Sequence, residues 1–289
     1  MLLIVACLAV APPVDAARIL GVGEPASVTA DVGVWVPRLT GTATVGSAGT
    51  AFNLDQDLSV QSSAPGVAGE FAVTVDRWRF GGLGFEASTS GTGAAPSAGN
   101  FGGVAIAAGD TVRGSYSSWM AGAEVGYVVW RPFADEPWPW SDPGDNRARA
   151  EAAIGRNGRP LVDLQVQALG GVMAFHYAQT VENLTAGGTA DFDRTAFCVY
   201  GGGGLDLRIG MDGRIPLIQD LRLYGNAGIG GGWPGADSVW MIRVGIAAMV
   251  DEHVGIEFGY RLFDFTLVDG PSQVDAGLRG LFGAVSLRF

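Results

Sequence analysis

The chain has 289 residues and a net charge of −11 at pH 7, which argues against a nucleic-acid-binding protein, because such proteins carry a basic surface. Its 46 glycines are too many for a helical protein, and no apolar run of about 18 residues follows the N-terminus. Two classes remain: a soluble β protein, and a membrane β-barrel whose apolar residues are spread over alternating strands.

Residues 1–16 have the pattern of an export signal. An apolar segment, Leu2–Ala11, precedes Val14-Asp15-Ala16, whose small residues fit a cleavage site. A lipobox-like sequence ends at Cys7, but six residues before it are too few for a lipoprotein signal. We therefore expect an exported barrel domain over residues 17–289, with Cys198 as its single cysteine and no internal disulfide.

Ten segments alternate between apolar and small or polar residues, which is the pattern of strands with two different faces. In chain order they are residues 30–36, 71–75, 83–87, 119–129, 162–174, 197–209, 221–229, 238–250, 254–262 and 281–289. In the third segment Leu83, Phe85 and Ala87 are assigned to the apolar face and Glu86 to the opposite face. An even number of strands is expected for a bacterial single-chain barrel.

The links between these segments predict how the barrel is oriented. With both ends of the domain on the periplasmic side, short turns are expected there at 76–79, 211–217 and 251–253. Longer external loops are expected at 39–65, 89–111, 179–191 and 267–275. Segment 131–160 is long and rich in Pro and Trp, yet it falls on the periplasmic side. It is either an unusual excursion or a sign that the strand count is wrong by one.

Residues Asn53–Leu58 resemble a D-L-x-x-D-L-G stretch of uncharacterised Gram-negative barrels, with Ser59 in place of the final Gly. Asp55 and Asp57 offer hard oxygen ligands for a cation, but the full ligand set of a calcium loop is missing. We therefore expect an ordinary loop or a short segment that caps the lumen.

Two other motifs also have structural interpretations. His176 lies near the outer end of its strand, and no motif places a nucleophile beside it. The glycine run 201–204 lacks the Lys-Ser/Thr of a phosphate loop. We expect the run to leave room inside the barrel for large neighbours such as Tyr200 or Tyr224.

The last nine residues alternate and end on an aromatic residue. Every second residue back from the end lies on one face: Phe289, Leu287, Val285, Gly283 and Leu281. This pattern resembles the C-terminal signature of Gram-negative outer-membrane β-barrels of the small-barrel or porin-like class. The resemblance implies an all-β, antiparallel, up-and-down transmembrane barrel in the cell outer membrane. It also implies two partners, outer-membrane lipid and the barrel-assembly machinery, with Leu281, Val285, Leu287 and Phe289 as the recognised residues.

In a membrane barrel the apolar face points outward and the charges point into the lumen. Two features favour this orientation. Aromatic residues lie near the ends of the apolar faces, as in an aromatic girdle: Trp119, Tyr127, Phe258, Tyr260 and Phe289. The opposite faces mix small residues with charges of both signs, which predicts a paired network in the lumen. That network is predicted to contain Glu70, Glu86, Glu124, Asp163, Asp206, Arg208, Arg222, Arg243, Glu257, Arg261 and Arg288.

We therefore expect an outer-membrane barrel of structural, surface-display or narrow-pore type, with charges that plug its lumen. Two alternatives remain open at this point. One is an outer-membrane enzyme acting on lipid A or peptides, in which His176 would pair with an external Ser or with Asp191 or Asp193. The other is a soluble exported barrel that binds a ligand inside. We expect no cofactor, no metal site and no catalytic residue.

Overall fold

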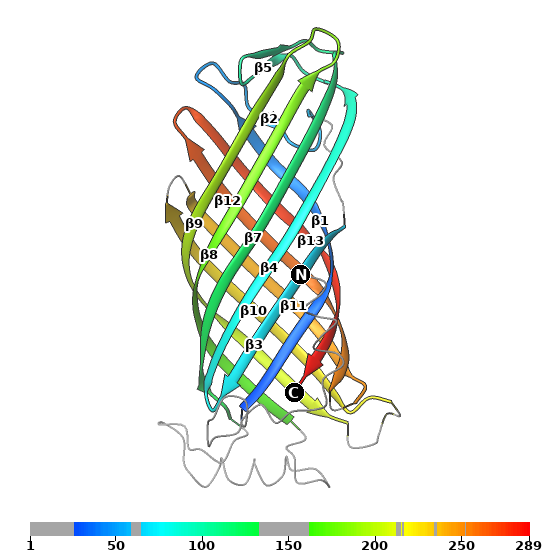
Figure 1. The fold of residues 1–289 in the computed structure, drawn as a ribbon, viewed down its shortest axis with the longest axis vertical. Helices are drawn as coiled ribbons and strands as arrows, with labels where there is room; N and C mark the ends of the chain where they lie inside the picture. Colours follow the sequence, from blue (N-terminus) through cyan, green and yellow to red (C-terminus); the bar gives the residue numbers. More distant parts are fainter. Residues whose placement is uncertain are drawn as a thin grey trace.

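The computed structural model describes residues 26–58, 65–132, 162–211, 215, 217–233, 236–251 and 253–289. Ten long antiparallel strands form one sheet in this part of the chain, and its first and last strands pair, so the sheet closes into a barrel (Figure 1). Around the barrel they are β1 (Ala26–Thr44), β3 (Gly66–Val75), β4 (Trp78–Ala94), β7 (Thr111–Trp130), β8 (Val162–Asn183), β9 (Thr189–Gly210), β10 (Asp220–Trp233), β11 (Ala236–Met249), β12 (Val254–Asp269) and β13 (Ser272–Arg288). The predicted all-β antiparallel barrel of ten strands is confirmed.

Short strands also occur in two links: β2 (Phe52–Asn53), β5 (Gly99–Phe101) and β6 (Val104–Ile106). The predicted export signal and most of segment 131–160 lie outside the described residues. Among the described residues, none forms a helix with the length and hydropathy needed to cross a membrane.

The C-terminal strand closes the barrel by pairing on both of its edges. It pairs with β12 from Ser272 onward and with β1 from Gln273 to Arg288. The ladder continues past the strand end, because the backbone N–H of Phe289 donates to the carbonyl of Val28 and the reverse bond also forms, both at 2.8 Å. The terminal residue is therefore held in the barrel wall, with its ring stacked on His253 at 6.1 Å between centroids.

The strands differ in length, so the upper rim of the barrel is uneven. Strands β8 and β9 have 22 residues each, whereas β10 and β11 have 14. About 9–11 residues are enough to cross a bilayer. In Figure 1 the β8–β9 hairpin reaches the top of the barrel. The long strands therefore continue well beyond the length that a membrane requires.

Strand extension makes two predicted external loops wrong. In the first, residues 179–183 and 189–191 belong to β8 and β9, so the loop is reduced to 184–188. Residues 267–275 contain a two-residue turn, 270–271, between β12 and β13. The backbones of small polar residues form strand hydrogen bonds as readily as those of apolar residues. A polar composition was therefore not enough to distinguish a loop from a strand. The short links between β3 and β4 and between β11 and β12 lie at the lower end, as predicted (Figure 1).

The outside of the barrel carries a belt of exposed apolar side chains that includes residues from each of the ten long strands. Phe197 and Phe258 are each 63% exposed, and Val199 is 67% exposed. Tryptophans lie at both ends of the belt, with Trp78 near the lower end and Trp119 near the upper end. A soluble barrel would bury these side chains, so the belt excludes the soluble alternative.

The predicted faces agree with the structure on nine of the ten strands, and β4 is the exception. Phe85 and Ala87 point into the barrel and are 4% and 1% exposed, whereas Glu86 lies exposed on the outer surface. The phase of β4 was therefore inverted in the prediction. The physical reason is that the upper half of the lumen is itself apolar, so apolar alternation there marks the inner face.

Candidate functional site

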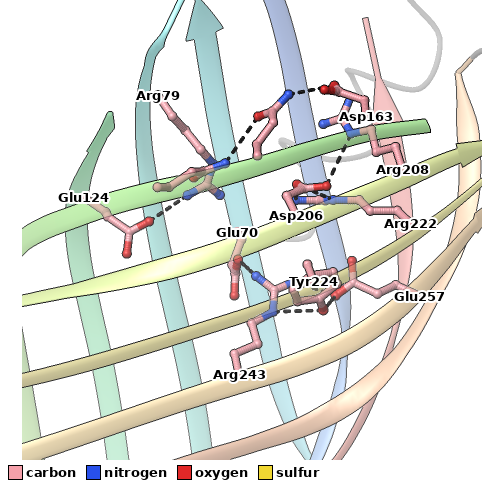
Figure 2. Close-up of polar contacts among 12 residues, drawn as sticks. Glu70, Arg79, Glu124, Asp163, Asp206, Arg208, Arg222, Tyr224, Arg243 and Glu257 are labelled. Carbon is pink, nitrogen blue, oxygen red and sulfur yellow. Dashed lines mark hydrogen bonds and ion pairs between the residues drawn. The ribbon is translucent and has the colours of Figure 1, made fainter. Parts of the chain in front are cut away.

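The lumen is the candidate site, and its lower half is filled by charged side chains. Figure 2 labels nine of these charged residues together with Tyr224, and they reach into the lumen from several strands. They form three clusters, each anchored by arginines that bind carboxylates. In a buried pair each charged side chain needs its partner, because an unpaired charge inside a protein is strongly unfavourable.

The central cluster spans the lumen from β3 to β11 and β12. Glu70 on β3 binds Arg243 on β11, and its other oxygen accepts a hydrogen bond from Arg261 on β12 at 2.7 Å. Arg243 also binds Glu257 at 2.5 Å, and the hydroxyl of Tyr224 donates to the same carboxylate. The wall strands β1, β13 and β12 separate β3 from β11 around the barrel. These bonds therefore connect nearly opposite sides of the wall.

Arg261 has a second set of contacts that continues upward from this cluster. Its guanidinium lies 5.1 Å from the ring centre of Phe282 and 5.8 Å from that of Trp35. Its Nε and Nη1 atoms are buried without a hydrogen-bond partner among the described residues. The faces of the two rings attract the cation, and they mark the start of the aromatic half of the lumen.

A second cluster lies on the β4, β7 and β9 side. Arg79 on β4 donates to Glu124 on β7 at 2.6 Å, and the hydroxyl of Tyr200 on β9 donates to the other oxygen of Glu124 at 3.2 Å. Tyr200 lies across Gly171, where a Cβ atom would come within 2.6 Å of its hydroxyl. Tyr224 lies in the same way across Gly245. Glycines do make room for both tyrosines, but at these positions rather than in the run 201–204.

The third cluster is at the lower mouth of the barrel. Asp206 binds Arg222 at 2.6 Å and lies 3.5 Å from Arg208. Arg288 on β13 reaches Asp220 on β10 at 3.1 Å. Nearby, Asp163 binds Arg131 through two hydrogen bonds of 2.8 and 3.0 Å and accepts a third from Gln165 at 2.9 Å.

Ten of the eleven predicted network residues are in ion pairs within the lumen or at its mouth, and the prediction was wrong for Glu86 alone. Sequence reasoning missed the partners Arg79, Arg131, Asp220, Tyr200 and Tyr224. Arg79 was missed because it fell in the predicted turn 76–79, whereas β4 begins at Trp78 and its odd-numbered residues point inside. Asp220 lies just before the predicted start of its strand, so only the correct strand boundary would have revealed it.

The upper half of the lumen is aromatic and contains closely packed rings. Phe175 packs against Phe263 and Phe265 with centroid distances of 4.9 and 4.4 Å. Phe85 links Phe263, at 5.6 Å, to Trp35, at 4.8 Å. Edge-to-face arrangements of this kind are favourable beyond simple burial. This layer has no counterpart in the prediction, which expected charges along the whole lumen.

Two links close the upper end above the aromatic rings. The link that contains β2 contributes Phe52, Leu54 and Leu58, and the β5–β6 hairpin contributes Phe101, and all four side chains are fully buried. Asp57 accepts the backbone N–H of Asn53 at 2.7 Å, and Asp55 binds Arg38 at 3.1 Å. The two carboxylates thus stabilise the link, which agrees with a capping segment.

Polar contacts fix the turns at the two ends of the barrel. Asp110 accepts hydrogen bonds of 2.8 Å from the backbone of Ala107 and from Asn183, which lower the pKa of its carboxyl. At the lower end, the backbone N–H groups of His253 and Val254 lower the pKa of Asp251. A lowered pKa means that these contacts stabilise the fold at neutral pH, and the contribution is lost as the pH falls through the lowered value.

A cavity of about 70 Å³ lies between the charged and aromatic halves. Glu70, Arg79 and Tyr200 line its polar side, and Phe85 and Met120 line its apolar side. This volume holds a few water molecules, whereas sites for organic ligands usually measure 300–1,000 Å³. The cavity therefore suits waters that complete the hydrogen bonds of the clusters.

His176, the residue that the enzyme alternative would use, contacts three side chains. It lies on the outer wall, stacked on Trp119 at 5.8 Å, and its Nδ1 atom is 3.1 Å from the Thr195 hydroxyl and 3.6 Å from Asp193. Both contacts use the same ring nitrogen, whereas a catalytic triad requires one nitrogen for each partner. Within the described ranges, no group of His, Cys, Asp or Glu side chains is placed to hold a metal ion.

Comparisons with known proteins place the chain by fold alone. No protein-family model matches it, and no curated protein matches it. Among solved structures, it is similar to the outer membrane protease OmpT of Escherichia coli, with a TM-score of 0.50 and 8% identity over 91% of this chain and 97% of that chain. It also matches Ail of Yersinia pestis, with a TM-score of 0.35 and 10% identity over 91% and 99% of the two chains. The closed ten-strand barrel with an apolar belt is the fold of outer-membrane β-barrels.

Proposed function

We propose that this protein resides in the outer membrane as a barrel that closes its own lumen, and that it serves a structural or surface-display role rather than forming a pore. The single observation that carries this proposal is the fully buried aromatic layer across the upper lumen, with Trp35, Phe175 and Tyr177 each 0% exposed. A pore needs a continuous polar path, and an apolar layer of packed rings excludes water and ions.

The charged clusters support the same proposal from the other half of the lumen. Their arginines and carboxylates bind one another across the barrel, so few charges remain free to attract a solute. A barrel that forms a narrow pore is therefore less well supported than a barrel with a closed lumen. An enzyme acting on lipid A or peptides has no observation in its favour, because the contacts of His176 do not form a proton relay.

Two partners belong to this proposal, outer-membrane lipid and the barrel-assembly machinery. The exposed belt supports the first. The C-terminal strand supports the second, because Leu281 and Val285 are exposed on the outer face and Phe289 ends the ladder.

Fractionation of Gram-negative cells that produce the chain tests the placement. We expect the folded protein in the outer-membrane fraction, and we expect Phe289→Ala to reduce its amount several-fold. The matched control is Phe258→Ala, which removes another ring from the outer belt of the neighbouring strand β12. Recovery of the wild-type chain in the soluble periplasmic fraction would overturn the proposal. Equal amounts of the two variants in the outer membrane would show that Phe289 has no special role in assembly.

A further inference from the structure

Strand β9 has a free edge near the upper rim of the barrel. One side of β9 pairs with β8 from Thr189 to Ile209. The other side pairs with β10 only between Phe197 and Gly210, because β10 ends at Trp233 opposite Phe197. In the part of the chain that the structure describes, residues 189–196 have no strand on that side. The backbone groups on that side lie in the plane of the sheet, where the edge of a strand can pair with an added strand.

The side chains of this edge alternate in character. Asp191 and Asp193 lie on the outer face and are exposed, whereas Ala190 and Phe192 point inward and are buried. Arg194 already binds Asp269 on β12 at 3.2 Å, so its charge is neutralised. The two aspartates therefore make this edge negatively charged toward a strand that binds along it.

We propose that residues 189–196 of β9 bind an extended peptide by strand addition, and that the peptide alternates basic and apolar residues. Residues directly opposite each other in a sheet point to the same face. Basic side chains opposite Asp191 and Asp193 would then point outward, and the apolar side chains between them would point toward Phe192. Backbone hydrogen bonds supply the affinity of this mode of binding, and the alternate side chains supply its specificity.

A second copy of the chain fits this edge poorly. Antiparallel self-pairing centred on Phe192 would place Asp191 directly opposite Asp193 of the other copy. Like charges opposite each other destabilise a sheet. The acidic pair thus prevents edge-to-edge association between copies and favours a basic partner.

Binding of a labelled octapeptide with alternating arginine and valine tests the proposal, measured by fluorescence anisotropy on the purified protein in neutral detergent. We expect saturable binding, and a block-ordered peptide with the same composition should bind at least tenfold more weakly. We also expect the Asp191→Asn/Asp193→Asn variant to weaken binding about tenfold. The matched control, Asp76→Asn/Asp275→Asn, removes two exposed charges elsewhere and should leave the affinity unchanged.

Backbone methylation distinguishes strand addition from simple charge attraction. Alternate amides of an added strand point toward β9, so methylating one alternate set should abolish binding, and methylating the other set should leave it intact. Equal affinities for the two methylated peptides would overturn the proposal, and so would dimers of the protein that peptide does not dissociate. The inference rests on the proposed function in one respect: the location in the outer membrane decides on which side of the membrane the peptide binds. Failure of peptide binding would therefore leave the closed barrel untouched.

Discussion

Arg243→Ala is expected to lower the free energy of unfolding by about 3–5 kcal/mol. Arg243 binds both Glu70 and Glu257 inside the lumen, where the two carboxylates are nearly inaccessible to solvent. Its removal leaves Glu257 with the Tyr224 hydroxyl and no ion-pair partner among the described residues, and a buried charge without its partner is far more costly than a lost surface pair. Urea unfolding of the barrel in lipid vesicles measures the change.

The matched control for this variant is Arg279→Ala. Arg279 forms a comparable two-bond pair with Asp264, but that pair lies exposed on the outer surface. Exposed pairs contribute about 0–1 kcal/mol. A double variant, Arg243→Met/Glu257→Gln, removes the cation together with the carboxylate that would be left without it, and Glu70 keeps its bond to Arg261, so part of the loss should be recovered. Equal losses for Arg243→Ala and Arg279→Ala would show that burial of the central cluster does not determine its contribution.

Phe175→Ala is expected to lower the free energy of unfolding by about 3–5 kcal/mol. The ring is fully buried between Phe263 and Phe265, and its removal would leave a cavity that these rigid neighbours cannot fill. The control is Phe197→Ala on the adjacent strand β9. Phe197 points outward, so lipid chains would occupy the vacated space and only the transfer term of about 2 kcal/mol is lost.

The same vesicle unfolding measurement compares the two phenylalanine variants. A larger loss for Phe197→Ala than for Phe175→Ala would contradict the assignment of inner and outer faces. Such a result would mean that the neighbours of Phe175 can move into the vacated space, which contradicts the close ring packing in the upper lumen.

The strands of this barrel were predictable because period-2 alternation reports directly on a wall with two different environments. Val34 and Val36 on β1, and Leu281 and Val285 on β13, all lie where the alternation placed them. Pairing of the C-terminal strand with β1 was predictable for a related reason, since a closed barrel leaves no edge. The charged residues of the lower lumen were predictable for the same reason, because they occupy the positions between the outward-facing apolar residues.

Alternation alone could not show where the lumen changes from polar to apolar. Phe85 and Phe197 both look like members of an apolar face, yet one ring packs inside and the other faces outward. Their strands extend past the belt, and above that level the rule for the inner face reverses. Glu86 was misplaced for this reason, whereas Arg79 was missed because the predicted strand began after it. The capping residues Phe52 and Phe101 depend on contacts between distant links, which a single strand pattern does not contain.

Single-channel recording in planar lipid bilayers tests the central claim most directly. The purified wild-type barrel is inserted from vesicles, and its folded state in the same vesicles is verified by its faster migration on an unheated gel. Because packed rings fill the upper lumen, we predict no conductance steps above the baseline of the bare bilayer. Stable ohmic steps whose number follows the amount of inserted protein would show an open water path and contradict the closed lumen.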